Sequence, residues 1–356
     1  MKPLRVLLAP VETAGVANAL RSGLRRRGHE ATVAVFAPHP FGIPHDRLVH
    51  GYGRRAAAGL AAPWRYDVLH FQFGTSLAEF LDVAWARAVR RPLVLMHYWG
   101  DDCRLPEITR SLHPGRSRVY DAVPRNARTT RRRLRLAGRL CHAAIVSDLE
   151  LLEHVRPFFS TVYVVPTPVE LPDAIGELPP LEGTGPVVFH APSEARIKGT
   201  AEILAAFDAL GQTRPLRPRT VSGLPRSEVL AELRRADVVV DQLNSETPGV
   251  FAIEAMMLGR PVVLEYRRAL LAPFAQDTPL VAATPETLAA RVAELCDDPD
   301  LRADLGRKGE DFARRVHDAD RVAVAIEQVY AHARTAAPGL FEATSDGIRP
   351  LRFPAA

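Results

Sequence analysis

The sequence predicts an α/β protein built from two successive domains, each a parallel sheet with helices on both faces. Its 356 residues exceed the usual size of one domain, which is about 150 residues. Short, continuous apolar runs alternate with amphipathic stretches along the chain, a pattern typical of buried parallel strands joined by helices. A proline-rich break near the middle separates two such series, which indicates one domain on either side of it.

The first series supplies the elements expected in the amino-terminal domain. A helix is predicted over Gly15–Arg27, where Val16, Leu20 and Leu24 recur at helical spacing, and another over Leu77–Val89. The predicted strands are Leu4–Leu8, Ala31–Phe36, Tyr66–Phe71, Pro92–His97, His142–Val146 and Val162–Val165.

The second series begins after the break. Its predicted strands are Val187–His190, Thr220–Ser222, Val238–Asp241 and Val262–Leu264. Its predicted helices are Gly199–Leu210, Ser227–Arg235, Gly249–Leu258, Pro285–Leu295, Pro299–Val316 and Ala319–Ala333. The expected boundaries are a first domain at 1–168, a linker at 169–186, a second domain at 187–318, a closing helix at 319–334 and an irregular tail at 335–356.

Composition excludes several classes of protein. Hydrophobic residues make up 47% of the chain and charged residues 24%, which is ordinary for a globular protein and unlike a disordered one. No apolar run reaches the roughly 18 residues of a membrane helix. The three cysteines are Cys103, Cys141 and Cys296. Their wide spacing supports neither a disulfide framework nor a zinc site, so we expect a cytoplasmic protein.

The segment Glu246–Pro261, E-T-P-G-V-F-A-I-E-A-M-M-L-G-R-P, carries the strongest chemical signal. Seven residues separate Glu246 from Glu254, and Gly249 is predicted to open a helix. Backbone N–H groups at a helix start suit an anion, and two carboxylates can accept hydrogen bonds from several sugar hydroxyls. The alternative is an ordinary loop and helix with two solvated glutamates.

This segment resembles the E-x7-E motif of glycosyltransferase family four, whose usual form is E-x-F-G-x-x-x-x-E-A-M-A-x-G-x-P-V. The spacing of Glu246 and Glu254 matches, as do Gly259 and Pro261. The chain departs at T-P-G-V-F, where Gly249 is displaced by one position.

A second matching segment is Phe189–Thr200, F-H-A-P-S-E-A-R-I-K-G-T, which follows a predicted strand. A cation there can neutralise a diphosphate. Lys198 and the glycine after it match the family's Lys-Gly pair. Pro192 stands where the family has an arginine, and Arg196 is the candidate to replace it. The alternative for Lys198 is a solvated residue at a helix start.

Three pieces of the first half also resemble the family. Thr13–Gly15 matches its first loop, although only Gly15 of the usual glycine pair is present. Asp67–Gly74 (DVLHFQFG) resembles its D-V-(I/L)-H strand, which brings in His70. His97–Arg104 (HYWGDDCR) resembles its strand that ends in histidine before G-x-D. For each histidine, simple packing with hydrogen bonding is the competing interpretation.

The resemblance covers about residues 4–334 and implies a GT-B fold, with two Rossmann-like domains facing across a cleft and a last helix that returns to the first domain. The implied reaction transfers a hexose-type sugar from a nucleoside diphosphate sugar, UDP favoured over GDP, to a hydroxyl acceptor with retention of configuration. It implies catalytic roles for His97, Lys198 and Glu246, and acceptor-side roles for Asp101 and His70. The implied donor-binding residues are Gly15, Ser193, Arg196, Lys198, Gly223, Leu224, Glu246, Gly249, Val250, Phe251 and Glu254.

No metal or other cofactor is expected, because Asp101-Asp102 is not a D-x-D motif and the His and acidic residues show no ligand spacing. The partners expected are the nucleotide-sugar donor and a small-molecule or glycan hydroxyl acceptor, without nucleic acid. The alternatives are a nucleotide-sugar epimerase or phosphorylase on the same scaffold and a non-catalytic nucleotide-sugar-binding protein.

The segment Arg104–Leu140 contains eleven arginines but only two acidic residues. Such a block can bind an anionic membrane or nucleic acid. Arginine is also the default cation of this chain, since only three of its 46 basic residues are lysines. A solvated helix face, peripheral contact with the inner membrane surface or an anionic acceptor, and nucleic acid therefore all stay open for this segment.

Overall fold

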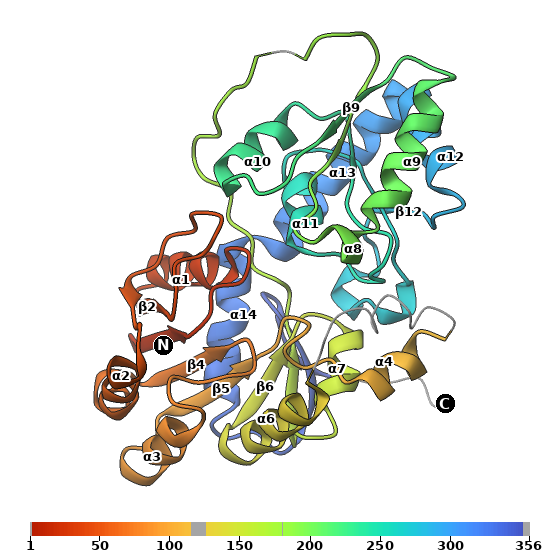
Figure 1. Cartoon of the computed structure of the whole chain (residues 1–356). Coiled ribbons are helices and arrows are strands. Elements are labelled where there is room, and N and C mark those ends of the chain that lie inside the picture. The colour runs from red at the N-terminus through yellow and green to blue at the C-terminus, as the bar shows by residue number, and fades with distance from the viewer. Residues whose placement is uncertain (1, 115–125, 180, 352–356) are drawn as a thin grey trace. The chain divides into compact units, whose positions relative to one another are not determined.

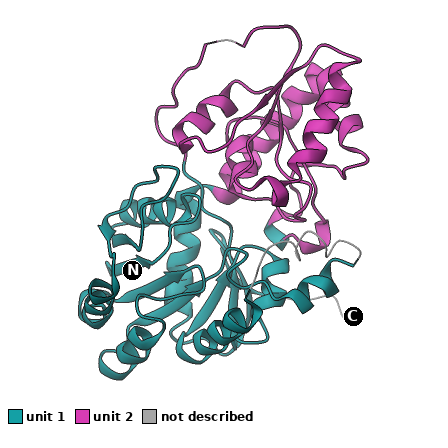
Figure 2. Ribbon diagram, in the orientation of Figure 1, with its two compact units in different colours: residues 1–170, 272–274, 318–356 teal, residues 171–271, 275–317 magenta. Residues whose placement is uncertain are grey.

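The computed structural model describes residues 2–114, 126–179 and 181–351. The chain divides into two compact units (Figures 1 and 2). Unit 1 comprises residues 1–170, 272–274 and 318–356, and unit 2 comprises residues 171–271 and 275–317. From Leu171 on, the segment expected to be a linker groups with unit 2.

Unit 1 contains a nine-stranded sheet in the order β14-β13-β7-β6-β5-β4-β1-β2-β3. All neighbouring strands are parallel except the last hairpin, β13–β14. Its strands are β1 Arg5–Ala9, β2 Glu30–Val35, β3 Arg47–Leu48, β4 Val68–Gln72, β5 Leu93–His97, β6 Ala143–Val146, β7 Thr161–Val164, β13 Gly339–Thr344 and β14 Gly347–Pro350. Its helices are α1 Val16–Arg26, α2 Tyr52–Arg65, α3 Leu81–Val89, α4 Pro106–Leu112, α6 Ala127–Leu140, α7 Leu149–Val155 and α14 Ala319–His332.

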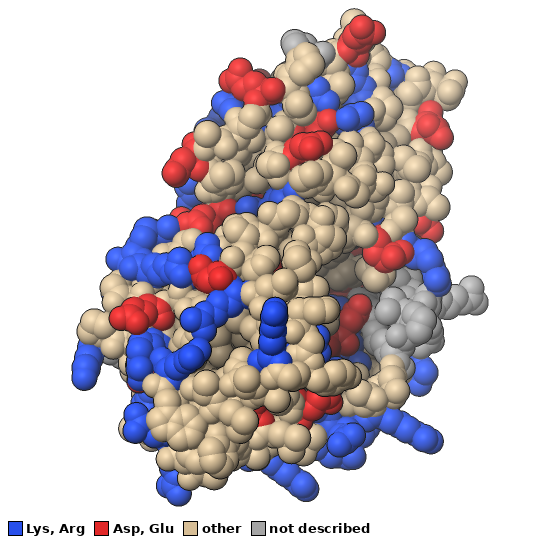
Figure 3. Space-filling view, turned by 60° about the vertical axis from the view of Figure 1, so that its left-hand side comes forward, with Lys and Arg blue, Asp and Glu red and all other residues tan. Residues whose placement is uncertain are grey.

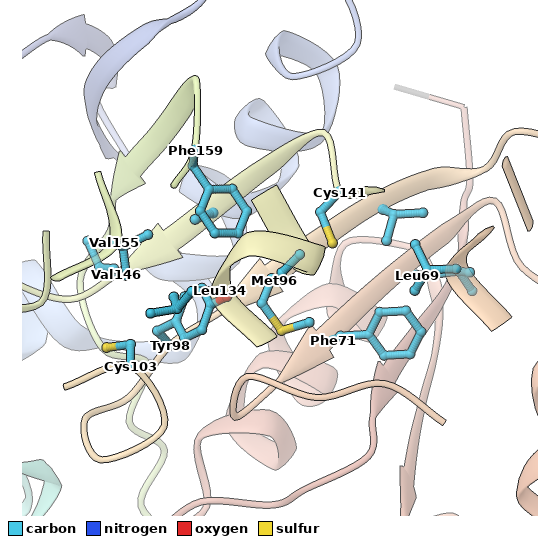
Figure 4. Close-up of a cluster of buried hydrophobic side chains, with 14 of the residues drawn as sticks. Leu69, Phe71, Met96, Tyr98, Cys103, Leu134, Cys141, Val146, Val155 and Phe159 are labelled. Carbon is cyan, nitrogen blue, oxygen red and sulfur yellow. The ribbon is translucent and has the colours of Figure 1, made fainter. Parts of the chain in front are cut away.

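Alternate residues of the central strands point into two cores, one on each face of this sheet. On β1, Leu7 and Ala9 pack with the residues under α2, α3, α6 and α7, while Val6 and Leu8 pack with those under α1 and α14. Figure 4 shows the first core, in which Met96 and Tyr98 lie near Leu134 of α6. The nearly continuous apolar strands follow from this burial on both faces.

The closing helix α14 returns to unit 1, as the sequence predicts, and packs against α1. Gly23 of α1 makes this close approach possible. A Cβ at Gly23 would lie 2.5 Å from the carbonyl oxygen of Ala319 and 2.8 Å from Cβ of Ala323.

The expectation of an irregular tail over residues 335–356 is wrong for residues 339–350. β13 pairs with β7 in parallel and with β14 in an antiparallel hairpin. Ser345 and Asp346 connect the two strands, and Gly347, the first residue of β14, has a φ of 137° that favours glycine. The Asp-Gly pair was an available hairpin signal.

Unit 2 contains a five-stranded parallel sheet in the order β12-β11-β10-β8-β9. Its strands are β8 Val187–His190, β9 Arg217–Thr220, β10 Val238–Val240, β11 Val262–Leu264 and β12 Val281–Ala282. Its helices are α8 Ala195–Lys198, α9 Thr200–Gly211, α10 Arg226–Arg234, α11 Val250–Met257, α12 Leu288–Asp297 and α13 Pro299–His317. A 3₁₀ turn spans Arg268–Leu270, and a second spans Pro273–Ala275, of which residues 273 and 274 group with unit 1. The bounds predicted for the strand at Thr220–Ser222 are wrong: the strand spans Arg217–Thr220, because these are the residues that pair with Val187–His190 of β8.

Candidate functional site

Lys198 lies at the end of α8, in the connection that follows β8. Gly199 separates α8 from α9 and has a φ of 69°, a left-handed conformation that favours glycine. Nζ of Lys198 donates to Oδ1 of Asp241 and to Oε1 of Gln242, both at 2.6 Å. An ammonium group has three N–H donors, so one donor of this largely buried lysine is left for a further acceptor.

Asp241 and Gln242 come directly after β10, at the carboxyl end of that strand, and both are buried. Oδ2 of Asp241 has no hydrogen-bond partner among the described residues. Nε2 of Gln242 donates to the carbonyl of Thr247 at 2.6 Å, so this side chain joins Lys198 to the loop that carries Glu246. Sequence reasoning missed both residues, although polar side chains directly after a buried strand of a parallel sheet are a usable signal.

The start of α11 lies beside Lys198. α11 begins at Val250, directly after Gly249, as the sequence predicts, and no side chain of the described residues caps this helix start. A Cβ at Gly249 would lie 3.9 Å from Nζ of Lys198 and 4.0 Å from Oδ2 of Asp241. The first N–H groups of a helix have no partner within it and carry the positive end of the helix dipole. An ammonium group and a helix start therefore converge, an arrangement that suits a phosphate.

The two glutamates of the motif lie at different depths, and each contacts its own arginine. Glu246 accepts from Nη2 of Arg267 at 2.9 Å, and the N–H of Arg267 donates to the carbonyl of Glu246 at 3.0 Å. Glu254, on α11, accepts from Nε of Arg226 at 2.7 Å and is 5% exposed. Burial raises the pKa of the Glu254 carboxyl, and the positive charge of Arg226 opposes that shift. Sequence reasoning missed both arginines.

The other predicted donor-binding residues of unit 2 are more peripheral. Ser193 and Arg196 are exposed, and the carbonyl of Arg196 accepts from Nδ2 of Asn244 at 2.9 Å. Gly223, with a φ of 69°, and Leu224 lie in the loop between β9 and α10. Val250 and Phe251 form the first turn of α11, and the Phe251 ring lies 6.0 Å from that of Phe189.

In unit 1, Gly15 precedes α1 in a left-handed conformation, with a φ of 89°. Glu12, which sequence reasoning also missed, accepts from the N–H groups of Ala17 (3.3 Å) and Asn18 (2.9 Å). Burial raises the pKa of its carboxyl, and these N–H groups oppose that shift. The start of α1 therefore already holds an acidic side chain of the protein.

The two predicted histidines form a buried chain of hydrogen bonds with Tyr330 of α14. Nδ1 of His70 lies 2.8 Å from the Tyr330 hydroxyl, and Nε2 of His70 lies 3.1 Å from Nδ1 of His97. Nε2 of His97 has no hydrogen-bond partner among the described residues. Burial lowers the pKa of His70 to about 3 and that of His97 well below its usual value, so both rings are neutral near pH 7.

The direction of this chain follows from its donors and acceptors. If Tyr330 donates to His70 and His70 donates to His97, only the Nε2–H of His97 is left unpaired. In the reverse direction, the Tyr330 proton and the Nε2 lone pair would both be buried without a partner, since Tyr330 makes no other hydrogen bond to a described residue. A buried unpaired polar group is costly, so the first arrangement is favoured. His97 then offers an N–H donor, and His70 fixes its tautomer.

The loop after β5 covers His97. The Trp99 ring stacks on His97 with centroids 3.9 Å apart, and Nε1 of Trp99 donates to Oε1 of Gln72 at 2.7 Å. Asp101, predicted on the acceptor side, is partly exposed and lies 3.4 Å from Nη1 of Arg104. Its neighbour Asp102 is turned inward and accepts from the N–H groups of Trp99 (3.1 Å) and Gly100 (2.8 Å).

An open hollow of about 420 Å³ lies elsewhere on unit 2, lined by residues 181–184, 211 and 214–218. None of the predicted site residues lines it. The candidate site around Lys198 therefore lies outside this hollow.

Residues 195–328 match the sequence model of a family described as glycosyl transferase-like. The match contains Lys198, Glu246 and Glu254, so the similarity to this family lies in unit 2 and α14. No curated protein matches the sequence.

Solved structures resemble the chain over nearly its whole length. Sucrose-phosphate synthase (tll1590) from Thermosynechococcus elongatus superposes with a TM-score of 0.63 at 14% identity, over 92% of this chain and 98% of that one. Anabaena Alr3699/HepE, in complex with UDP and glucose, gives a TM-score of 0.60 at 14% identity, over 92% of this chain and 99% of that one. A Listeria monocytogenes protein described as a UDP-N-acetylglucosamine 2-epimerase gives a TM-score of 0.51 at 14% identity, over 95% of this chain and 99% of that one. At these identities the likeness shows the fold, which is GT-B.

Proposed function

We propose, for this GT-B chain with a glycosyltransferase-like domain at residues 195–328, that it transfers a hexose-type sugar from a nucleoside diphosphate sugar to a hydroxyl acceptor, with retention at the anomeric carbon. One observation carries the proposal: Lys198 lies beside the start of α11, and the helix and the loop before it carry Glu254 and Glu246. Two motifs about fifty residues apart in the sequence thus meet at one point, where a diphosphate would find an ammonium group and free helix N–H donors.

Different residues of unit 2 bind different parts of the donor. Lys198 and the N–H groups at the start of α11 bind the diphosphate, and Glu254 accepts from the ribose hydroxyls. Glu246 accepts from hydroxyls of the transferred sugar, held in place by Arg267. The backbone of residues 221–224, with Gly223 and Leu224, contacts the base. The exposed Ser193 and Arg196 contribute at the edge of the phosphate site.

In unit 1, His97 donates from Nε2 to an oxygen of the donor sugar, and His70 acts through His97 because both of its own ring nitrogens are occupied. Gly15 permits close approach of the first loop to the donor. Asp101 accepts from the acceptor hydroxyl or organises the loop that binds it.

The chemistry is mainly stabilisation of charge. The bond between the anomeric carbon and the phosphate oxygen breaks while the acceptor oxygen bonds to that carbon, and the leaving phosphate takes the acceptor's proton. Negative charge therefore grows on the diphosphate, next to Lys198 and the start of α11, where fixed donors stabilise it. No enzyme carboxylate forms a covalent intermediate in this scheme, and no metal ion is needed, so turnover should persist in excess chelator.

The test is a transfer assay. Purified protein is incubated with UDP- and GDP-sugars and a panel of hydroxyl acceptors, and the anomeric configuration of any product is assigned by NMR. The proposal expects transfer with retention, UDP-sugars preferred over GDP-sugars; HepE, solved with UDP and glucose, supports that preference. Inverted product, or activity lost to chelator and restored by manganese, would contradict the proposal.

A nucleotide-sugar epimerase is the second candidate, and one structural neighbour described as such favours it. Incubation of the donor without acceptor separates the two, because only an epimerase would convert the donor. A non-catalytic binding protein would bind nucleoside diphosphate sugars in a thermal-shift panel and turn over none of them with any acceptor.

A further inference from the structure

Three helices of unit 1 lie side by side over one face of its sheet. The buried sides of α2, α3 and α6 all contribute to the same core, α3 contacts both other helices, and Figure 1 shows the three together. Nε1 of Trp85 donates to the carbonyl of Leu60 at 3.3 Å, and Nη1 of Arg87 donates to the carbonyl of Leu140 at 2.8 Å. The outer sides of these helices therefore form one surface, which we call the α2–α3–α6 face.

Large apolar side chains protrude from this face. The exposed fractions are 88% for Tyr52, 76% for Leu81, 55% for Leu60, 46% for Trp64 and 39% for Trp85. The two tryptophan rings lie 5.9 Å apart. Of the eight large hydrophobic residues that are exposed in the described part of the chain, these five gather on two adjacent helices. Such a concentration marks an interaction surface.

The charge of this face is predominantly positive, although Glu79 and Glu107, in segments next to α3 and α6, pair with Arg133 and Arg131 of α6. The three helices contain ten arginines and one acidic residue. That residue, Asp82, is buried and accepts from the Ser76 hydroxyl and the N–H of Leu77. The exposed arginines of α6 follow helical spacing and so form a stripe: Arg128, Arg132, Arg135 and Arg139. Figure 3 shows Lys and Arg side chains around uncharged areas in the lower part of the view, with some acidic side chains among them.

We propose that the α2–α3–α6 face docks on an anionic lipid surface. Burial of tryptophan, tyrosine and leucine side chains at the boundary between headgroups and acyl chains is favourable, because it removes apolar surface from water. Arginines beside them contact lipid phosphates. The positive charge complements an anionic leaflet. In this proposal the helices lie along the membrane surface. Among the described residues, no helix combines the length and the apolar composition that crossing a bilayer requires.

This proposal refines the interpretation of the arginine-rich segment 104–140, of which residues 115–125 lie outside the described part. Arginines alone would suit any polyanion, including nucleic acid. Protruding leucine and clustered tryptophan beside them favour lipid. The proposal does not rest on sugar transfer, and its test requires no turnover.

The test is co-sedimentation of the full chain with vesicles of phosphatidylcholine alone and vesicles that also contain phosphatidylglycerol. The wild-type protein should sediment with the anionic vesicles several-fold more than with the neutral ones, and raised salt should reduce binding. The double variant Tyr52→Ser/Leu81→Ser should lose most of this binding. These two side chains are the most exposed, so the fold should not depend on them. Arg132→Gln/Arg139→Gln should lose the preference for anionic vesicles.

The matched control removes one exposed leucine and one exposed arginine from unit 2, as Leu204→Ser/Arg307→Gln, and should bind like wild type. Unchanged thermal unfolding of each variant verifies its fold. Absence of sedimentation with either vesicle, or wild-type binding by both variants of the face, would overturn the proposal. So would a concentration-dependent rise in mass by light scattering that Tyr52→Ser/Leu81→Ser abolishes, because that result would assign the face to a second copy of the chain.

Discussion

Lys198 combines burial with an unused donor. It lies between Asp241 and Gln242, and α11 starts beside it. A phosphate oxygen can take the remaining N–H without displacing either partner. Arg196, two residues earlier, is exposed. Water therefore screens its guanidinium, and a contact between Arg196 and phosphate should contribute less to binding than the contact of Lys198.

We predict that Lys198→Ala weakens UDP binding by roughly ten- to a hundredfold, because a hydrogen bond to a charged group contributes about 1.5–3 kcal/mol. Arg196→Ala, the matched control, should have a smaller effect. Calorimetric titration with UDP measures both. Equal affinity of wild type and the Lys198 variant would remove this residue from the phosphate site.

Tyr330 acts on His97 through His70. We predict that Tyr330→Phe leaves His70 without its donor, so that the Nε2–H tautomer of His97 loses its preference. Turnover should then fall by up to about tenfold, the equivalent of one neutral hydrogen bond, while UDP affinity stays unchanged. Two-bond ¹H–¹⁵N NMR spectra of the histidine rings report the tautomer directly.

The matched control is Tyr163→Phe. The Tyr163 hydroxyl lies 2.7 Å from Nδ1 of His332, also on α14, and Tyr163 is fully buried. Its loss removes a similar tyrosine–histidine bond without touching His97. If both variants change turnover alike, the effect of Tyr330 is on packing of α14 and not on the tautomer.

At the scale of one element, the proposed function gives different roles to Glu254 of α11 and to Glu246 in the loop before it. We predict that Glu254→Gln weakens binding of both UDP and the UDP-sugar, because the ribose is common to the two ligands. Glu246→Gln should leave UDP affinity nearly unchanged and lower kcat, because the proposed function gives Glu246 contacts to the transferred sugar and none to UDP. Both substitutions keep the shape of the side chain.

UDP affinity and kcat of the two variants decide between these roles. Similar loss of UDP affinity in both, or normal turnover of Glu246→Gln, would make the pair structural. In that case the main role of the two glutamates would be to form ion pairs, Glu246 with Arg267 and Glu254 with Arg226.

The loop between β5 and α4 depends on Asp102, which holds the N–H groups of Trp99 and Gly100. Burial raises the pKa of its carboxyl to about 6, and these backbone hydrogen bonds oppose the shift. Because the folded protein binds this proton more tightly than the unfolded chain, Asp102 contributes stability below about pH 4. That contribution is lost as the pH rises through about 6.

We therefore predict that Asp102→Asn, which keeps an acceptor oxygen, is stabilised relative to wild type as the pH rises from about 4 to 8. The gain should be on the order of 1–3 kcal/mol, since one pKa unit corresponds to about 1.4 kcal/mol. Unfolding midpoints of both proteins across this range provide the comparison, with pH 4 as the internal reference. A constant difference between the two proteins would show that Asp102 ionises without cost.

At the scale of the whole molecule, the last segment of the chain, from residue 318 on, packs into unit 1 together with the first 170 residues. α14 covers α1, and β13 extends the sheet beside β7. We predict that Gly23→Ala destabilises unit 1 by about 1–3 kcal/mol, a usual cost of overpacking, because its Cβ would overlap Ala319 and Ala323.

Gly211→Ala is the control for this prediction. Gly211 ends α9, and a Cβ there would have no atom of the described residues within 4 Å beyond its own neighbourhood in the helix, so the substitution should be neutral or stabilise by up to about 1 kcal/mol. Thermal unfolding measures both variants. A Gly23→Ala protein as stable as wild type would mean that α14 can move away from α1 without loss.

The sequence by itself determined the α/β class, the positions of most strands and the two segments that meet at Lys198 and α11. These features depend on local information: apolar runs report burial on both faces of a sheet, and a motif fixes residues of one loop and one helix. It also predicted the return of the last helix to unit 1. The hairpin β13–β14 escaped it, because β13 owes its conformation to pairing with β7, and tertiary context outweighs weak local propensity.

Only the tertiary structure decided which side chains pair. The partners of Lys198, Glu246 and Glu254 lie on other strand ends or helices, and the sequence contains no local sign of those pairings. The bond between His70 and Tyr330 joins residues 260 positions apart. A hydrogen bond depends on distances of tenths of an ångström, and those distances arise only when the order of strands in the sheet brings distant loops to the same edge.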